Sequence, residues 1–414
     1  MKNFISRWFG EVREAVVLSP LARAERRRDR AGLPQEDPGA EPVLHALLEW
    51  LSLAQDRSAS ADGGVARTFD LLRGWETSYP ETTGYIVPTF IDYARRYRRK
   101  EALERARRMA DWLVAIQLPG GGFQGGRIDS TPVVPVTFNT GQILIGLAAA
   151  EAEFGGFREA MIQAADWLVA TQDADGCWRR YPTPFAAAGE KEYETHVAWG
   201  LFEAARVEPG HGYGEAGMAN VRWALSSQGS DGWLSKCCLD NPEQPLTHTI
   251  GYALRGVLEA YRYRPDPLLL DGARRIADGL LQASGVDGWL SGRLKRGWKP
   301  AVDSVCLTGV AQVATCWFIM HELTAERRYL DAALRANAFV RRTVYLDGPI
   351  ELRGGVKGSF PVDGQYGRYQ LLNWAAKFLA DSLIMELDLS RTPAAAAREG
   401  AAIAQPGVRL PVAD

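Results

Sequence analysis

The sequence lacks any segment able to span a membrane, because its 414 residues contain no run of about 18 uninterrupted apolar residues. Its first twenty residues, MKNFISRWFGEVREAVVLSP, lack the continuous apolar core and small-residue cleavage site of a secretory signal. Cysteine is scarce: the five cysteines form no CxxC pair, and their odd number suits a reduced compartment better than a disulfide framework. A net charge of −2 lacks the basic excess typical of nucleic-acid-binding proteins. These absences predict a cytoplasmic protein that does not bind nucleic acid.

The most regular feature of the sequence is an internal repeat. An apolar stretch ends in a short glycine-containing turn at intervals of 55, 56 and 55 residues between the central units, and at 62 and 59 residues in the flanking ones. The residues at the end of the apolar stretch are Gln55, Gln117, Gln172, Gln228, Ala283 and Arg342. A nearly fixed period of this length predicts a repeat fold in which neighbouring units bury one another's apolar faces.

Each repeat is predicted to contain two helices. The first is amphipathic and ends at the turn. The second helices are richer in Ala, Gly and small polar residues, and several are apolar nearly all round, as expected of helices buried on both sides. The second helices are predicted at residues 82–97, 138–154, 193–205, 246–261, 306–323 and 373–387. Six inner and six outer helices predict an all-α fold, an (α/α)6 toroid of six helical hairpins.

The toroid is predicted to span residues 43–390, with residues 1–42 as an N-terminal extension and residues 391–414 as a flexible tail. Residues 1–18 place apolar side chains on one helical face and are followed by an arginine cluster at 23–30. Such a helix either docks on its own domain or contacts an anionic membrane surface. A peripheral contact of residues 1–30 with the inner membrane surface is therefore one of two expectations.

The turn formed by Gln172, Gly176 and Trp178 resembles the QW motif of the squalene-cyclase and prenyltransferase repeat superfamily. Residues 306–340 and the later GGVKGSFP and YGRYQLLNWAAKF segments resemble uncharacterised toroid proteins of bacterial exopolysaccharide gene clusters, with a six-hairpin glycosidase-like architecture. The resemblance covers roughly residues 45–390 and implies the toroid fold. The D-x-C zinc motif of prenyltransferases and the D-x-D-D acid of the cyclases are both absent, so we expect neither a metal nor a cofactor.

Polar and aromatic residues gather where the inner helices are expected to begin. Because these helices run parallel in a toroid, their N-termini open onto one mouth, where their dipoles favour an anionic group. Threonine and asparagine at these positions are expected to cap the helices. The predicted catalytic residues are Glu76, Glu81, Glu194, Asp303 and His248. The predicted substrate-binding residues are Trp75, Tyr79, Tyr85, Asn139, Gln142, His196, Tyr252, Lys357, Tyr366 and Arg368.

Aromatic side chains mixed with carboxylates suit a sugar chain, whose ring faces stack while its hydroxyl groups form hydrogen bonds. The leading hypothesis is an enzyme that hydrolyses a bacterial polysaccharide or oligosaccharide in the mouth of the toroid. One carboxylic acid would protonate the glycosidic oxygen while a second carboxylate activates water or attacks directly. In this sequence Glu76 or Glu81 would work against Glu194 or Asp303.

Three alternatives remain open at this point. In a polysaccharide lyase or uronate epimerase, Tyr79, Tyr252 or His248 would abstract the C5 proton, and Lys357 or Arg368 would neutralise the carboxylate. A terpene cyclase or prenyltransferase-like enzyme would need a deep aromatic cavity. A non-catalytic glycan-assembly protein would have its mouth blocked by its own loops.

Overall fold

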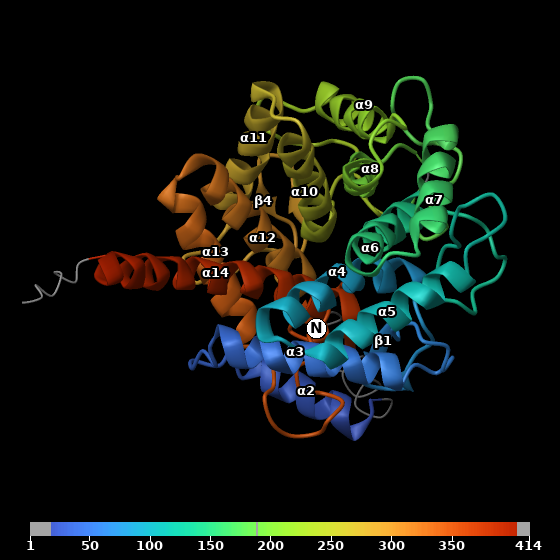
Figure 1. Cartoon of the computed structure of the whole chain (residues 1–414). Helices are drawn as coiled ribbons and strands as arrows, with labels where there is room; N and C mark the ends of the chain where they lie inside the picture. Colours follow the sequence, from blue (N-terminus) through green and yellow to red (C-terminus); the bar gives the residue numbers. More distant parts are fainter. Residues whose placement is uncertain (1–17, 188, 404–414) are drawn as a thin grey trace, which may run out of the picture.

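The computed structural model describes residues 18–187 and 189–403, and within them six helical hairpins follow one another around a ring (Figure 1). The outer helices are α3 (Ala40–Asp56), α5 (Lys100–Ala115), α7 (Arg158–Thr171), α9 (Tyr213–Ser226), α11 (Pro267–Ala283) and α13 (Arg327–Arg341). The inner helices are α4 (Pro80–Tyr97), α6 (Thr137–Phe154), α8 (Thr195–Val207), α10 (Thr247–Tyr263), α12 (Leu307–Thr324) and α14 (Asn373–Ile403). Each inner helix packs on the next, and α14 packs on α3 and α4. This closure confirms the predicted (α/α)6 toroid.

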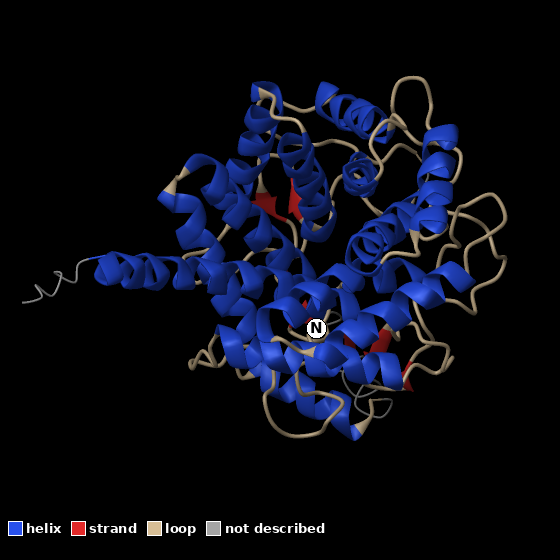
Figure 2. Ribbon diagram, viewed as in Figure 1, coloured by secondary structure: helices blue, strands red, loops and turns tan. Residues whose placement is uncertain are grey.

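The few strands lie in the loops before the inner helices (Figure 2). They are β1 (Thr68–Asp70), β2 (Gly74–Trp75), β3 (Leu294–Lys295), β4 (Lys299–Pro300), β5 (Val305–Cys306), β6 (Ser359–Phe360) and β7 (Gln370–Leu372), and a 3-10 turn, η1 (Glu192–Glu194), precedes α8. Strand β1 pairs antiparallel with both β2 and β7. This small sheet therefore joins the loop before α4 to the loop before α14, which are the first and last hairpins of the ring.

The repeated glutamine connects neighbouring hairpins. The Nε2 group of Gln172 donates to the carbonyl oxygen of Gly176 in its own turn, at 3.0 Å, and to that of Ala216 in α9, at 2.9 Å. Gln55, Gln117 and Gln228 make the same two kinds of hydrogen bond. The glutamine thus holds its own turn and the next outer helix together through two backbone carbonyl groups.

The glycine of the last turn lets the backbone of the sixth hairpin approach the backbone of the first closely. Gly354 has a φ of +76°, and a Cβ added there would lie 1.9 Å from the carbonyl oxygen of Ala46 in α3. Gly176 makes the equivalent approach to α9, with 2.5 Å between an added Cβ and the Ala219 oxygen. A side chain at either position would push two neighbouring hairpins apart, so the turns need glycine.

The threonines at the starts of the inner helices do not act as caps. No side chain caps α4, α6, α8, α10 or α12. Thr83 instead lies inside α4, where its hydroxyl donates to the Tyr79 carbonyl and accepts from the Val65 amide. Thr140 bonds to Val136 and Phe123 in the same way. The capping prediction is wrong, because Thr83 and Thr140 instead tie α4 and α6 to the turns of their own hairpins.

The N-terminal extension packs on the toroid. Helix α2 (Pro20–Arg30) begins with Ser19, whose hydroxyl accepts from the Ala22 amide at 3.0 Å. Its buried Asp29 accepts from the Val362 amide at 2.7 Å and forms an ion pair with Lys357. Residues 1–17, which carry most of the predicted amphipathic helix, lie outside the described residues. Residues 20–30 therefore dock on their own domain.

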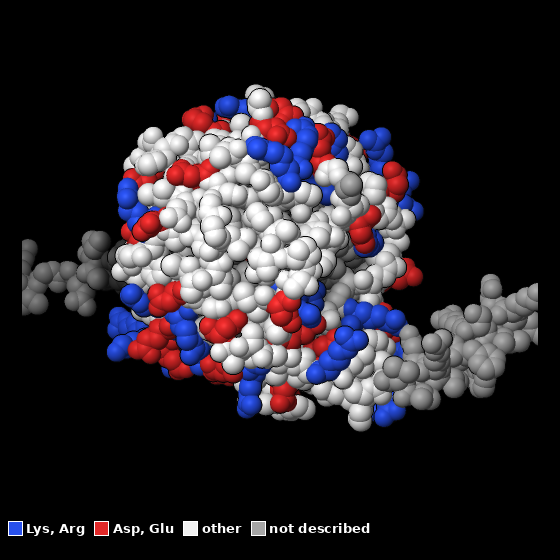
Figure 3. Space-filling view, turned by 90° about the vertical axis from the view of Figure 1, so that its right-hand side faces the viewer, with Lys and Arg blue, Asp and Glu red and all other residues white. Residues whose placement is uncertain are grey.

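The remaining features concern the surface and the C-terminal end. Among the described residues, no helix is long and apolar enough to cross a membrane. On the face drawn in Figure 3, acidic and basic side chains are mixed, and the middle of the face is largely uncharged. Helix α14 continues to Ile403 and so runs past residue 390, where the tail was predicted to begin.

Candidate active site

A cavity of about 450 Å³ opens where the inner helices begin. Its walls come from the first turns of α4, α6, α10 and α14, from η1, and from the loops before them. The lining residues are Arg67, Tyr79, Glu81, Tyr85, Gly126, Arg127, Ser130, Phe138, Thr183, Phe185, Tyr193, Leu239, His248, Thr249, Tyr252, Tyr366, Gly367, Gln370 and Trp374. We call this space the central cavity. It gathers residues from five hairpins, as expected for the mouth of a toroid with parallel inner helices.

Among the described residues, Glu81 is the one carboxyl group that lines the central cavity. Burial raises its pKa from 4.5 to about 7, while a hydrogen bond from the Tyr79 hydroxyl and the charge of Arg67 act in the opposite direction. Burial and the neighbouring Glu81 also raise the pKa of Tyr79 well above its usual value. A carboxyl group with a pKa near 7 can supply a proton at neutral pH, which an exposed glutamate cannot do.

His248 supplies a proton acceptor to the same cavity. Its Nδ1 lies 2.6 Å from the Oε1 atom of Gln312 in α12. Because an amide oxygen only accepts hydrogen bonds, Nδ1 carries the proton and Nε2 is left as the unprotonated nitrogen. Burial lowers the pKa of His248 to about 4, although the Gln312 hydrogen bond opposes this shift. The imidazole is therefore neutral, with Nε2 available to accept a proton, at the pH where Glu81 is protonated.

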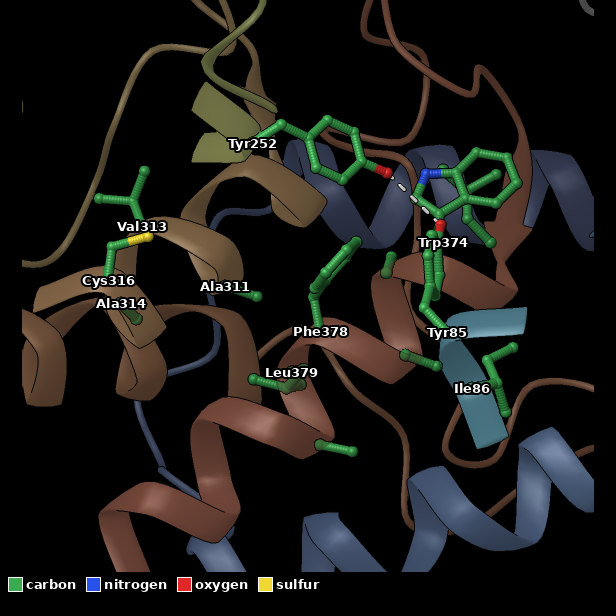
Figure 4. Packing of buried hydrophobic residues seen from close by; sticks show 14 of the residues in the cluster. Tyr85, Ile86, Tyr252, Ala311, Val313, Ala314, Cys316, Trp374, Phe378 and Leu379 are labelled. Carbon is green, nitrogen blue, oxygen red and sulfur yellow. Dashed lines mark hydrogen bonds between the residues drawn. The ribbon is translucent and has the colours of Figure 1, made fainter. Parts of the chain in front are cut away.

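Aromatic side chains form much of the cavity wall. The hydroxyl oxygens of Tyr85 and Tyr252 lie 3.4 Å apart and point toward each other beside Trp374 (Figure 4). The indole Nε1 of Trp374 donates to the Tyr366 hydroxyl at 2.9 Å. The ring of Tyr252 also lies 4.4 Å from that of His248, centroid to centroid. Such rings offer flat apolar faces together with hydroxyl groups, which suits the stacking of a sugar.

Two arginines at the cavity wall share one carboxylate that lies behind them. Nη1 of Arg67 is 3.1 Å from Oε2 of Glu76, and Nη1 of Arg127 is 3.2 Å from Oε1 of the same side chain. Glu76 does not line the cavity, because both of its oxygens are engaged by these arginines. Trp75 also lies outside the lining and packs between Trp50 and Phe69, with centroid distances of 5.4 and 5.0 Å.

His196 and its partners are buried in the ring outside the cavity lining. The Nδ1 atom of His196 is 2.6 Å from Oε1 of Gln142 in α6, so the pair repeats the arrangement of His248 with Gln312. Burial lowers the pKa of His196 well below its usual value. Asn139 is buried in the same region. These three predicted binding residues therefore lie outside the cavity lining, although the ring of His196 packs 4.5 Å, centroid to centroid, from that of Tyr252, which does line it.

Four other predicted residues also fall outside the central cavity. Asp303 is exposed in the loop before β5. Lys357 is held by α2, and the guanidinium of Arg368 lies 5.4 Å from the ring centroid of Tyr369. Glu194 lines a separate, smaller cavity, where burial raises its pKa to about 8. The expected pair of carboxylates on opposite walls is therefore replaced by one carboxyl group and one histidine.

The sequence reasoning missed several lining residues. Arg67 and Arg127 lie in loops, and nothing in the sequence around them distinguishes a cavity arginine from a surface one. Phe138 and Trp374 were predicted only as parts of inner helices. Gln312, the partner of His248, was also missed. Both histidines follow a threonine at the start of an inner helix, as Thr195-His196 and Thr247-His248, and this repetition was the available clue. Within the described residues, no group of three or more His, Cys, Asp or Glu side chains could hold a metal ion.

The toroid is shared with several solved carbohydrate-active enzymes. An unsaturated glucuronyl hydrolase specific for heparin superposes with a TM-score of 0.69 at 14% sequence identity, covering 85% of this chain and 97% of its own. A D-mannose isomerase gives 0.67 at 11% identity, covering 84% and 97%. Cellobiose 2-epimerase from Bacillus thermoamylovorans gives 0.63 at 13% identity, covering 82% and 97%. No family model and no curated protein matches the sequence. At these identities the likeness shows a common fold.

Proposed function

We propose that this protein is a carbohydrate-active enzyme that hydrolyses a glycosidic bond of an acidic oligosaccharide in the central cavity. The observation that carries the proposal is the pairing of a proton donor, Glu81, with a proton acceptor, His248, in one aromatic-walled cavity. Glu81 would protonate the glycosidic oxygen as the bond breaks. The Nε2 atom of His248 would take a proton from the attacking water. The common fold with a glucuronyl hydrolase supports a hydrolytic reaction.

The charge at the cavity supports an acidic substrate. Arg67 and Arg127 both line the cavity, whereas the carboxylates that pair with them, Glu76 and Asp129, lie outside the lining, so the charged groups that these pairs present to the cavity are the guanidinium groups. The N-terminal ends of the surrounding inner helices add partial positive charge of the same sign. A uronic acid carboxylate or another anionic group on the sugar would bind at this wall. Such a group would orient the glycosidic oxygen relative to Glu81.

A second reaction, epimerisation or isomerisation of a sugar, is favoured by one specific observation. Hydrolases with two carboxylates place both in the cavity, whereas here the second proton-transfer group is a histidine. A neutral imidazole and a carboxylic acid can also remove and return a proton at a carbon next to a carbonyl group. The toroid enzymes with the same fold include a cellobiose 2-epimerase and a D-mannose isomerase.

Product analysis distinguishes the two reactions. The purified protein is incubated with glucuronic-acid-containing oligosaccharides, and the products are separated by chromatography and weighed by mass spectrometry. Fragments whose summed mass has gained one water indicate hydrolysis, and an unsaturated end indicates elimination. A product of unchanged mass but different retention indicates epimerisation or isomerisation. Substrates that all remain unchanged would contradict the proposal.

The pH dependence of kcat/KM tests the assignment of donor and acceptor. His248 must be neutral, which requires a pH above about 4, and Glu81 must be protonated, which requires a pH below about 7. We expect a bell-shaped profile with its maximum between these values. Glu81→Gln should lower turnover by about 10²–10⁴-fold. Asp303→Asn, an exposed residue outside the cavity, serves as the control and should keep full turnover. Full activity of Glu81→Gln would place the acid elsewhere.

A further inference from the structure

A second cavity of about 260 Å³ adjoins the central cavity. Thr183 and Tyr193 line both cavities, so the two spaces lie next to each other at these side chains. The second cavity is bounded by Trp178, Arg179, Pro182, Thr183, Ala186, Gly189, Glu190, Lys191, Tyr193 and Glu194. A ligand longer than one sugar residue could extend from the first space into the second.

Two buried oxygen atoms at the second cavity have no hydrogen-bond partner among the described residues. They are Oε2 of Glu194 and the hydroxyl of Tyr193, which belong to side chains that are 4% and 2% exposed. Buried polar atoms in folded proteins are nearly always hydrogen bonded, and leaving one unpaired costs free energy. Because burial raises the pKa of Glu194 to about 8, its carboxyl group is largely protonated at neutral pH. It can therefore donate a hydrogen bond as well as accept one.

The charges of Arg179 and Glu190 at the second cavity are already compensated. Arg179 forms ion pairs with Asp173 at 2.9 Å, with Asp175 at 2.7 Å and with Glu190 at 2.5 Å. Glu190 also forms an ion pair with Lys236. Trp178, buried and fixed by a hydrogen bond from its indole nitrogen to the Leu168 carbonyl, adds an aromatic wall. Lys191, also in the lining, is buried with its Nζ 4.0 Å from the Sγ of Cys238. The cations Arg179, Lys191 and Lys236 equal in number the carboxylates Asp173, Asp175 and Glu190, so this group of side chains carries no net charge. Together with the aromatic wall and the unpaired hydrogen-bonding groups, this balance suits a neutral sugar.

We infer that the second cavity binds a neutral sugar residue adjacent to the acidic residue held in the central cavity, with Glu194 and Tyr193 bonded to its hydroxyl groups. This inference rests on the proposed function and adds a substrate class, namely an oligosaccharide in which an acidic and a neutral sugar are neighbours. It also gives Glu194 a binding role instead of the catalytic one expected from the sequence.

Direct binding tests the inference without turnover. The Glu81→Gln variant is titrated by calorimetry with glucuronic acid and with two disaccharides in which glucuronic acid is joined to glucose at either end. We expect one disaccharide to bind more tightly than glucuronic acid. Adding Glu194→Leu, which removes the hydrogen-bonding group, should weaken binding of that disaccharide about five- to tenfold and leave glucuronic acid unaffected. Adding Glu194→Gln instead, which keeps a donor and an acceptor, should restore most of the affinity.

The outcomes separate this inference from the proposed function. If glucuronic acid binds but neither disaccharide binds more tightly, the second cavity is not a sugar site and only the inference is wrong. The same conclusion follows if Glu194→Leu, shown by its melting curve to be folded, weakens both ligands equally. If none of the three probes binds and the wild-type protein leaves acidic oligosaccharides unchanged, the proposed function is wrong and the inference falls with it.

Discussion

Replacing Glu81 by glutamine should stabilise the protein at alkaline pH while it removes activity. In the unfolded chain a glutamate ionises near its ordinary pKa of 4.5, whereas in the folded protein Glu81 holds its proton up to about pH 7. Between these two values the folded state binds one more proton, so this group makes the folded state less stable as the pH rises. Above pH 7 the penalty is complete. Glutamine has a similar shape and cannot ionise, so the variant does not lose folding free energy as the pH rises.

The size of the effect follows from the pKa shift. A shift from 4.5 to about 7 corresponds to an upper limit of about 3.5 kcal/mol at about 1.4 kcal/mol per pH unit. Water entering the cavity would reduce this value, so we expect a gain of about 1–3 kcal/mol for Glu81→Gln at pH 8 relative to pH 4.5. The hydrogen bond from Tyr79 is retained in the variant, because the amide oxygen of glutamine also accepts.

Urea denaturation followed by tryptophan fluorescence measures this gain, with the wild type and the variant unfolded at pH 4.5 and at pH 8. The free-energy difference between the two proteins should grow in favour of the variant as the pH rises. Asp303→Asn, a change at an exposed carboxylate, provides the control and should alter stability by less than about 0.5 kcal/mol at both pH values. A Glu81→Gln protein that is less stable at pH 8, or a difference independent of pH, would refute the reasoning and with it the role of Glu81 as the acid.

Two further changes test the packing. Trp178→Ala removes a buried indole and its hydrogen bond to Leu168, and should cost about 3–5 kcal/mol in urea denaturation; an unchanged unfolding curve would show that the indole does not hold the repeat together. Lys357→Met leaves Asp29 buried without its cation, and should cost about 3–5 kcal/mol and expose the arginines of α2 to trypsin. Cleavage within residues 20–30 as slow as in the wild type would mean that α2 docks without this ion pair.

The fold was accessible from the sequence because its signals are local and repeated. The spacing of Gln117, Gln172 and Gln228 gave the period, and the apolar composition of the second helix in each unit gave the inner ring. The expected inner-helix ranges begin within two residues of the observed ones, an ordinary uncertainty for helix ends. The prediction of threonine caps was wrong, since it considered only the helix and not the turn that packs against it.

The candidate site was accessible only in part. Among the residues expected at the mouth, the central cavity contains Tyr79, Glu81, Tyr85, His248, Tyr252 and Tyr366. The spacing of the WETSYPETTGY segment could not separate Glu76 from Glu81, because both carboxylates lie within one short segment of the sequence. The difference arises from Arg127, which comes from another hairpin and engages Glu76. The link to squalene cyclases and to exopolysaccharide gene clusters stays a prediction.

The sequence by itself determined the toroid, because hydrophobic periodicity and turn residues act over a few neighbouring positions and repeat along the chain. Only the tertiary structure decided which ionisable groups face the cavity. Lys357 shows why: it lies in a loop that the sequence directs toward the mouth, yet α2, more than three hundred residues earlier, supplies the carboxylates that bury it. Desolvation and ion pairing depend on neighbours from distant segments, so the pKa values that define Glu81 and His248 emerge only when the ring is closed.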